Sequence, residues 1–396
     1  MKFLNKLAIL LIKLYQYTFS SHTWIFKDFL YSKPVCTHNP HCSEYWKQCF
    51  EKYDFLTALK FTMERIINCK PSNTIKYDPS SYKVIFFSSA PIWVPFLKKL
   101  VEDKRFEVVW VVTMPDAPAW RGQKLKENII AEEAKKLWIT NIYKPEKIKN
   151  NENLVKQLKS LNPDFFVVIS YWKILPKEIL QIPKFWPINI HWSILPKYRW
   201  ASPIQSVFLN WEKESWITIM YMDEWMDTGD IIKILKIPLD KKDNAKTLID
   251  KFIKFWPDFL VDVLWDFWKL KLKRTPQNDS EATYCRKFTK EDGKIDFKNE
   301  TAEEIYRKFQ AFYLWPGIYD IWNWKLVKFT DIEIDPGVDT PKELIWKRIV
   351  DKSTPGSKKI KVYTKDWAVI INKLKLEWKK EMTAEEFINW YKDFLD

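Results

Sequence analysis

Three polar residues in the middle of the chain have the types and spacing of a catalytic group. Asn189 and His191 lie two positions apart in an apolar run, and Asp227 follows 38 residues after Asn189. An amide can donate to a developing oxyanion, an imidazole can move a proton near neutral pH, and a carboxylate can orient that imidazole. His191 is also the only histidine beyond residue 80. On residue types alone, a structural role for this Asn and His stays open.

The elements around these residues predict a mostly parallel sheet. Apolar runs rich in β-branched residues alternate with helical stretches, which is typical of strands covered by helices. The expected strands are residues 84–87, 108–113, 142–143, 165–170 and 188–191, and residues 217–222 and 231–239 add two strands that would pair as a hairpin. Side chains two apart on a strand leave the same face. Asn189 and His191 would therefore lie together at a carboxyl end, where open parallel sheets bind ligands.

The chain is long enough for several domains. Residues 1–80 predict a small α-helical module, residues 82–272 the α/β domain with a last helix over 245–272, and residues 273–285 a polar linker. Residues 286–396 predict a helix over 302–312 followed by a small β-barrel. Between residues 347 and 380 this region carries eleven Lys or Arg against three Asp or Glu. A solvated face and a phosphate-binding surface both remain open for it, although the net charge of +14 favours an anionic partner.

The composition is unusual in its glycine and tryptophan contents. The chain holds 6 Gly and 23 Trp in 396 residues, whereas ordinary chains carry roughly 7% Gly. Several Trp occupy turn-like positions, among them Trp211, Trp324 and Trp390, each directly after an Asn. We hypothesise that UGA codons of the gene encode glycine and were translated as tryptophan. A protein that is simply rich in aromatics is the alternative.

The residues around the polar group resemble a family signature. The matching stretches are Asn189-x-His191-x-Ser193-x-Leu195-Pro196 with Tyr198-Arg199, and Asp227-Thr228-Gly229-Asp230. Together they resemble formyltransferases that use 10-formyltetrahydrofolate. The resemblance implies a Rossmann-like fold, catalytic roles for Asn189, His191 and Asp227, and no metal. It also implies that Ser193, Ile194, Leu195 and Pro196 line the folate site.

Two further stretches resemble the methionyl-tRNA formyltransferases within that family. Residues 115–125 look like the loop that enters the tRNA acceptor stem, which implies tRNA contacts for Arg121, Lys124 and Lys126. Residues 315–317 and 383–387 resemble the OB-like tRNA-binding appendage. The expected partner is initiator methionyl-tRNA, and the expected state is a monomer in the cytoplasm. A formyltransferase for an amino sugar or glycinamide ribonucleotide, and an inactive scaffold that binds tRNA or membrane, are the alternatives.

The first 80 residues resemble a different family, the YidD membrane protein insertion efficiency factors. The resemblance rests on residues 11–16, 36–45, 65–71 and 77–79. It implies a peripheral protein on the inner membrane face, in agreement with the amphipathic pattern of residues 1–20, for which an ordinary core helix is the alternative. Cys36, His38, His41 and Cys42 could bind a metal, but their irregular spacing favours structural cysteines.

Overall fold

A computed structural model describes most of the chain. The described residues are 2–18, 38–67, 76–77, 79–118, 125–266, 274–336, 342–351, 358–391 and 394. The chain divides into two compact units, residues 1–188 with 256–273 and residues 189–255 with 274–396. Each unit is described by itself below.

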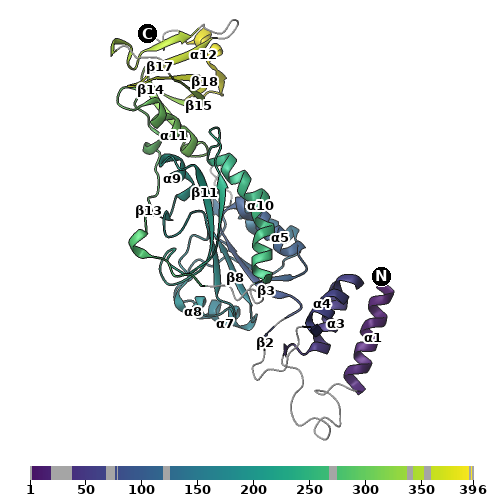
Figure 1. Ribbon diagram of the computed structural model, residues 1–396. Helices are drawn as coiled ribbons and strands as arrows, with labels where there is room; N and C mark the ends of the chain where they lie inside the picture. The colour runs from purple at the N-terminus through teal and green to yellow at the C-terminus, as the bar shows by residue number, and fades with distance from the viewer. Residues whose placement is uncertain are drawn as a thin grey trace. The chain divides into compact units, whose positions relative to one another are not determined.

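The first unit begins with a helical module. Helices α1 (Lys2–Thr18), α3 (Cys42–Lys52) and α4 (Phe55–Ile67) lie against one another (Figure 1), and β1 (His38–Asn39) pairs in parallel with β2 (Lys76–Tyr77). The module has its own small core of Tyr45, Cys49, Phe50, Tyr53 and Ala58. For the described residues between 2 and 80, the predicted helical character is confirmed.

Cys49 is a core residue of this module. Its side chain is fully buried, as the structural interpretation of the cysteines requires, and Cys42 at the start of α3 is partly buried. Within the described residues, no three His, Cys, Asp or Glu side chains lie close enough to share a metal ion. Cys36 and Cys69 lie outside the described residues, so the metal alternative is untested.

Four parallel strands form the rest of the first unit. Strands β3 (Tyr82–Ser88), β4 (Phe106–Val112), β7 (Ile142–Tyr143) and β8 (Phe165–Ile169) are neighbours in the order β8-β3-β4-β7. Nearly every side chain of β3 is buried, as expected of a strand covered on both faces. The helices that follow these strands in the chain are α5 (Val94–Glu102), α6 (Ile129–Lys136), α7 (Glu152–Ser160) and α8 (Lys177–Leu180). Asn128 and Asn151 cap the N-termini of α6 and α7 through their side chains.

The second unit contains the strands that carry the polar group. Strand β9 (Pro187–His191) lies beside β11 (Glu214–Tyr221), which forms the predicted antiparallel hairpin with β12 (Ile231–Pro238). Helix α9 (Pro203–Leu209) precedes β11, and α10 (Ala245–Asp266) begins at the predicted residue. The short strand β10 (Arg199–Trp200) pairs with β13 (Tyr284–Cys285). The predicted α/β class is confirmed.

The C-terminal part is an antiparallel sheet of six strands. The order is β14-β15-β18-β17-β16, with β19 pairing β18, over Ile318–Trp322, Lys325–Asp335, Ala368–Leu376, Lys359–Tyr363, Arg348–Asp351 and Met382–Thr383. Helix α11 (Ala302–Phe312) begins at a capping box of Thr301 and Glu304 and packs on β15 and α9. Helix α12 (Ala384–Trp390) starts with a second capping box and packs on β17 and β18. A strand-rich module after residue 286 is confirmed, and its helix has the predicted bounds.

Several tryptophans have a backbone that suits glycine. Of the thirteen described non-glycine residues with positive φ, seven are Trp, with φ between 56° and 80°. They are Trp138, Trp186, Trp200, Trp211, Trp324, Trp346 and Trp378. A bulky side chain rarely adopts this region, whereas glycine enters it freely. Trp138, Trp324 and Trp378 are also at least 93% exposed, so the indole gains no burial there.

Candidate active site

Strand β9 places Asn189 and His191 at its carboxyl end. The alternation of the strand sends both side chains to one face, and the imidazole is buried while the amide is half-buried. The Asn189 Nδ2 atom lies 3.5 Å from Asp227 Oδ1, and His191 Nδ1 lies 3.6 Å from the same oxygen. The structure therefore brings the three predicted catalytic residues together.

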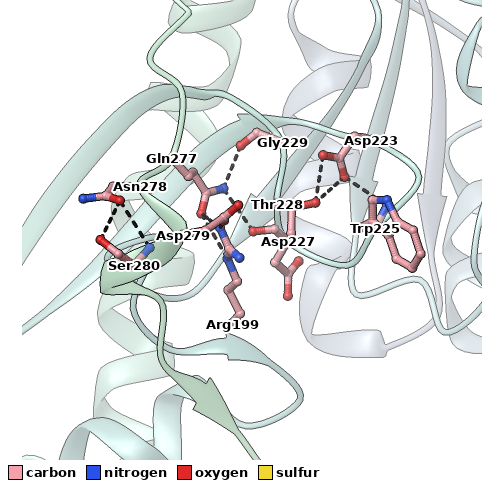
Figure 2. A network of polar contacts seen from close by, with 10 residues as sticks. All are labelled: Arg199, Asp223, Trp225, Asp227, Thr228, Gly229, Gln277, Asn278, Asp279 and Ser280. Carbon is pink, nitrogen blue, oxygen red and sulfur yellow. Dashed lines mark hydrogen bonds and ion pairs between the residues drawn. The ribbon is translucent and has the colours of Figure 1, made fainter.

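The loop between β11 and β12, residues 222–230, carries Asp227 and requires a glycine. A Cβ atom at Gly229 would lie 2.0 Å from the backbone oxygen of Tyr221, so only glycine lets the loop fold back onto β11. Within the loop, the Asp223 carboxylate accepts hydrogen bonds from the Thr228 hydroxyl at 2.7 Å and from the Trp225 backbone amide at 3.1 Å (Figure 2). Asp227 itself has a positive φ of 60° and is 9% exposed.

A second turn, residues 198–200, completes the surroundings of the carboxylate and the imidazole. The Trp200 amide donates to Asp227 Oδ2 at 2.9 Å, and His191 Nε2 lies 2.9 Å from the Tyr198 backbone oxygen. Because a carbonyl oxygen can only accept, Nε2 carries the proton of this contact and Nδ1 faces Asp227. Both ring nitrogens of His191 thus face a protein acceptor.

Tyr198 fixes that turn through its phenol. Burial raises the pKa of Tyr198 to about 12, and the phenol hydrogen-bonds to Glu212. Its backbone amide donates to Thr283 Oγ1 at 2.9 Å, and the neighbouring Arg199 amide donates to the Thr283 backbone oxygen at 2.9 Å. The segment after residue 274 therefore holds the turn that contacts His191.

The predicted folate segment follows β9 directly. Thr218 Oγ1 donates to the Ser193 backbone oxygen at 2.7 Å and accepts from the Leu195 amide at 3.3 Å. The side chains of Ser193 and Leu195 are buried, whereas those of Ile194 and Pro196 are half-exposed. Ile194 and Pro196 are thus the side chains of this segment that a ligand could reach.

The residues predicted for tRNA contact are only partly described. Arg121 and Lys124 lie outside the described residues. Lys126 is exposed in β6 (Leu125–Lys126), which pairs with β5 (Ala117–Pro118). On β18 of the C-terminal sheet, Lys373 and Lys375 are exposed and alternate with the buried Leu374 and Leu376.

Sequence reasoning assigned no role to two residues that contact this site. Arg199 is 1% exposed, and it hydrogen-bonds Gln277, which in turn donates to the backbone of the Asp227 loop. Arg199 stood within the matched motif, which was the available signal. Gln277 lies in a polar segment predicted to be a linker. The local sequence of such a segment does not indicate a contact with a distant part of the chain.

Family comparisons match nearly the whole chain. Residues 82–264 match the formyl transferase model, residues 287–392 match the formyl transferase C-terminal domain, and residues 4–81 match the membrane protein insertion efficiency factor model. The chain is 36% identical over 309 residues to a methionyl-tRNA formyltransferase of Caldicellulosiruptor saccharolyticus, covering 78% of this chain and 97% of that protein. It is 37% identical to the methionyl-tRNA formyltransferase of Clostridioides difficile, covering 77% of this chain and 96% of that one.

Solved structures share the fold at low identity. HypX from Aquifex aeolicus, solved in complex with tetrahydrofolic acid, matches with a TM-score of 0.53 and 14% identity over 78% of this chain and 47% of HypX. The present chain thus spans about half of HypX. WlaRD, a sugar 3N-formyl transferase, matches with a TM-score of 0.52 and 19% identity over 76% of this chain and 99% of that chain. With matched N- and C-terminal domains and relatives covered almost end to end, the chain belongs to the formyl transferase family, among the methionyl-tRNA formyltransferases.

Proposed function

We propose that the chain transfers the formyl group of 10-formyltetrahydrofolate to the α-amino group of initiator methionyl-tRNA, with Asn189, His191 and Asp227 as its reaction centre. The observation that carries the proposal is that Asn189 Nδ2 and His191 Nδ1 both lie within 3.6 Å of the same carboxylate oxygen of Asp227. The identity to methionyl-tRNA formyltransferases over nearly their full length supports the acceptor.

Asn189 and His191 would stabilise the charge that develops during transfer. When the amine attacks the formyl carbon, negative charge develops on the carbonyl oxygen, and pre-placed N–H donors stabilise it. One N–H of the Asn189 amide is directed to Asp227, which leaves the second for the oxyanion. His191 would supply a second donor, and for this its Nε2–H must turn from the Tyr198 carbonyl oxygen towards the substrate.

Asp227 would hold the imidazole and help to remove the amine proton. Its Oδ2 is fixed by the Trp200 amide, so Oδ1 is the oxygen that faces both Asn189 and His191. A carboxylate in this place can orient the imidazole and can accept the proton of the amine directly or through water.

The segment after β9 would hold the formyl donor, which supplies the carbon that is transferred. The polar side chains beside this segment are the amide of Asn189, the imidazole of His191 and the carboxylate of Asp227. These groups suit an uncharged carbonyl group and an amine. The half-exposed Ile194 and Pro196 give an apolar surface next to these groups, and backbone atoms of Ser193 and Leu195 are held in place by Thr218. We expect no metal to take part.

Two groups of basic residues would contact initiator tRNA. We propose Arg121, Lys124 and Lys126 as contacts to the acceptor stem and the basic C-terminal sheet as a contact to phosphates. The full-length chain is expected to act as a monomer, which light scattering of the purified protein would test.

Acceptor specificity can be tested by offering two acceptors to the full-length chain. With 10-formyltetrahydrofolate as donor, formylation of initiator methionyl-tRNA is compared with that of a dTDP-linked amino sugar. The proposal predicts transfer to the tRNA and no measurable transfer to the sugar nucleotide. Equal or faster transfer to the sugar would contradict the tRNA assignment, and the shared fold with WlaRD makes this the informative alternative.

We further propose that the helical module rests on the cytoplasmic face of a membrane rich in anionic lipid. Helix α1 exposes Leu7, Leu10, Leu11 and Leu14, and α4 exposes a second set of apolar side chains, Leu56, Leu59, Met63, Ile66 and Ile67. Lys6 and Lys13 are interspersed with the leucines of α1, a combination typical of helices lying in the interface. Among the described residues, no helix is both long and apolar enough to span a bilayer.

Vesicle flotation tests the membrane proposal. The full-length chain should float with vesicles containing phosphatidylglycerol, and Leu10→Glu with Leu14→Glu should abolish this. The matched control Leu125→Glu with Ile174→Glu makes the same charge change at exposed apolar residues outside the module and should still float. Flotation of both variants alike, or of neither wild type nor control, would contradict the proposal.

A further inference from the structure

We propose that Gln277 is a positioning residue for Asp227, and that it acts together with the buried Arg199. The inference rests on the proposed role of Asp227. It concerns residues 274–285, which follow the α/β strands in sequence and take no part in the two contacts that join Asn189, His191 and Asp227.

Gln277 binds the Asp227 loop through its backbone. Its Nε2 donates to the backbone oxygen of Asp227 at 3.0 Å and to that of Gly229 at 2.7 Å (Figure 2). These two oxygens flank Thr228, so one amide group fixes both sides of the peptide segment that carries the carboxylate. Asp227 has a positive φ of 60°, a conformation that a non-glycine residue keeps only when its surroundings hold it.

Arg199 fixes the orientation of the Gln277 amide. Its Nε and Nη2 donate to Gln277 Oε1 at 3.2 and 2.8 Å, and Nη2 also pairs with Asp279 at 2.7 Å. A guanidinium can only donate, so Oε1 must face it and Nε2 must face the loop. Arg199 is 1% exposed, and its neighbours in sequence are Tyr198 and Trp200, which contact His191 and Asp227. One buried side chain thus connects the turn at residue 198 with the Asp227 loop.

The backbone of the segment is held on the same elements. Thr275 and Ile231 exchange backbone hydrogen bonds of 2.9 and 3.1 Å at the start of β12, and β13 pairs with β10. Gln277 therefore sits between two anchored points and has little freedom to move away. Since misplacement of a catalytic group by about 1 Å can cost on the order of a hundredfold in rate, losing this contact should reduce turnover.

Steady-state kinetics of the full-length chain test the inference with two substitutions. Gln277→Ala removes both contacts, whereas Gln277→Glu keeps an acceptor for Arg199 and removes the donors to the loop. Both should lower kcat at least about tenfold while KM for each substrate stays within about twofold. The matched control is Asn278→Ala, because Asn278 contacts only Ser280 and Glu281 among the hydrogen bonds of this segment, and it should leave kcat within about twofold.

A double-mutant cycle separates positioning from loss of fold. In an Asp227→Asn background, which keeps the backbone oxygens, Gln277→Ala should cost less than about threefold, because the charge it positions is gone. Normal kcat in Gln277→Ala, or the same loss in both backgrounds, would overturn the inference while Asp227 remains catalytic. Normal kcat in Asp227→Asn alone would instead overturn the proposed role of Asp227.

Discussion

At the scale of single residues, the site combines residues that contact the substrate with residues that shape the backbone. Asn189 and His191 would act on the substrate directly, while Gly229 and Thr218 shape the backbone that presents them. Both kinds of residue can be tested by substitution, and the two kinds of substitution should affect different properties. Substitution of a residue that contacts the substrate should lower turnover. Substitution of a residue that shapes the backbone should lower stability.

The imidazole of His191 gives the first prediction. His191→Ala should lower kcat for formyl transfer by about a hundredfold or more, because a donor to the developing oxyanion is lost. His41→Ala removes an exposed histidine of the helical module and is the matched control, with turnover unchanged. A His191→Ala protein with near-normal turnover would remove His191 from the reaction centre.

Gly229 gives a second prediction, about stability. Gly229→Ala should lower the free energy of unfolding by about 3 kcal/mol, because its Cβ would overlap the Tyr221 backbone oxygen. Gly317→Ala is the control: its φ is +78° but no atom lies within 4 Å of the added Cβ, so the cost should be about 1 kcal/mol. Urea unfolding measures both, and equal losses would show that the close approach at Gly229 is not a constraint.

Much of the site could be predicted from the sequence, for a physical reason. Asn189 and His191 lie on one strand, where the two-residue alternation fixes their common face, and the family signature supplied Asp227. The contacts of Gln277 join residues 48 and 50 positions apart. No local pattern encodes such a pairing, so only the folded chain reveals it.

At the scale of elements, strands and helices with strong patterns were predictable and turns were not. The buried run of β8 and the helix α11 with its capping box carry their signals locally. The segment from 274 to 285 is polar and rich in turn-forming residues. This composition is equally typical of a free linker and of a segment that is bound to a site. Whether it also marks a domain boundary stays a prediction.

The left-handed turns give a third prediction, about the tryptophans. Trp138→Gly, Trp324→Gly and Trp378→Gly should each raise the free energy of unfolding by about 1 kcal/mol, because the strained turn is relieved and no buried contact is lost. Trp322→Gly is the control in the opposite direction. The Trp322 side chain in β14 is buried against Phe329 and Phe387. Its loss should therefore lower the free energy of unfolding by about 3 kcal/mol or more.

The gene itself tests the recoding hypothesis. We propose that the seven tryptophans with positive φ are encoded by UGA and are glycine in the native protein. UGG at Trp138, Trp324 or Trp378 would contradict this, because UGG encodes tryptophan and the indole would then be the native side chain.

At the scale of the whole molecule, the charge of +14 predicts salt-dependent tRNA binding. The apparent affinity for methionyl-tRNA should fall steeply as salt rises, since each phosphate contact releases counterions. Lys373→Ala with Lys375→Ala should weaken affinity and reduce the slope of log affinity against log salt by roughly 2. Lys147→Ala with Lys149→Ala removes two exposed lysines elsewhere and should leave the slope unchanged.

The most direct measurement of the central claim is formyl transfer by the full-length chain from labelled 10-formyltetrahydrofolate to initiator methionyl-tRNA. It should be made with the printed sequence and with glycine at the seven left-handed positions, each with and without Asn189→Ala. We expect transfer by the glycine-containing chain, and a loss of about a hundredfold on Asn189→Ala. Binding of tRNA without any formyl transfer by either form, or transfer that Asn189→Ala leaves intact, would contradict it.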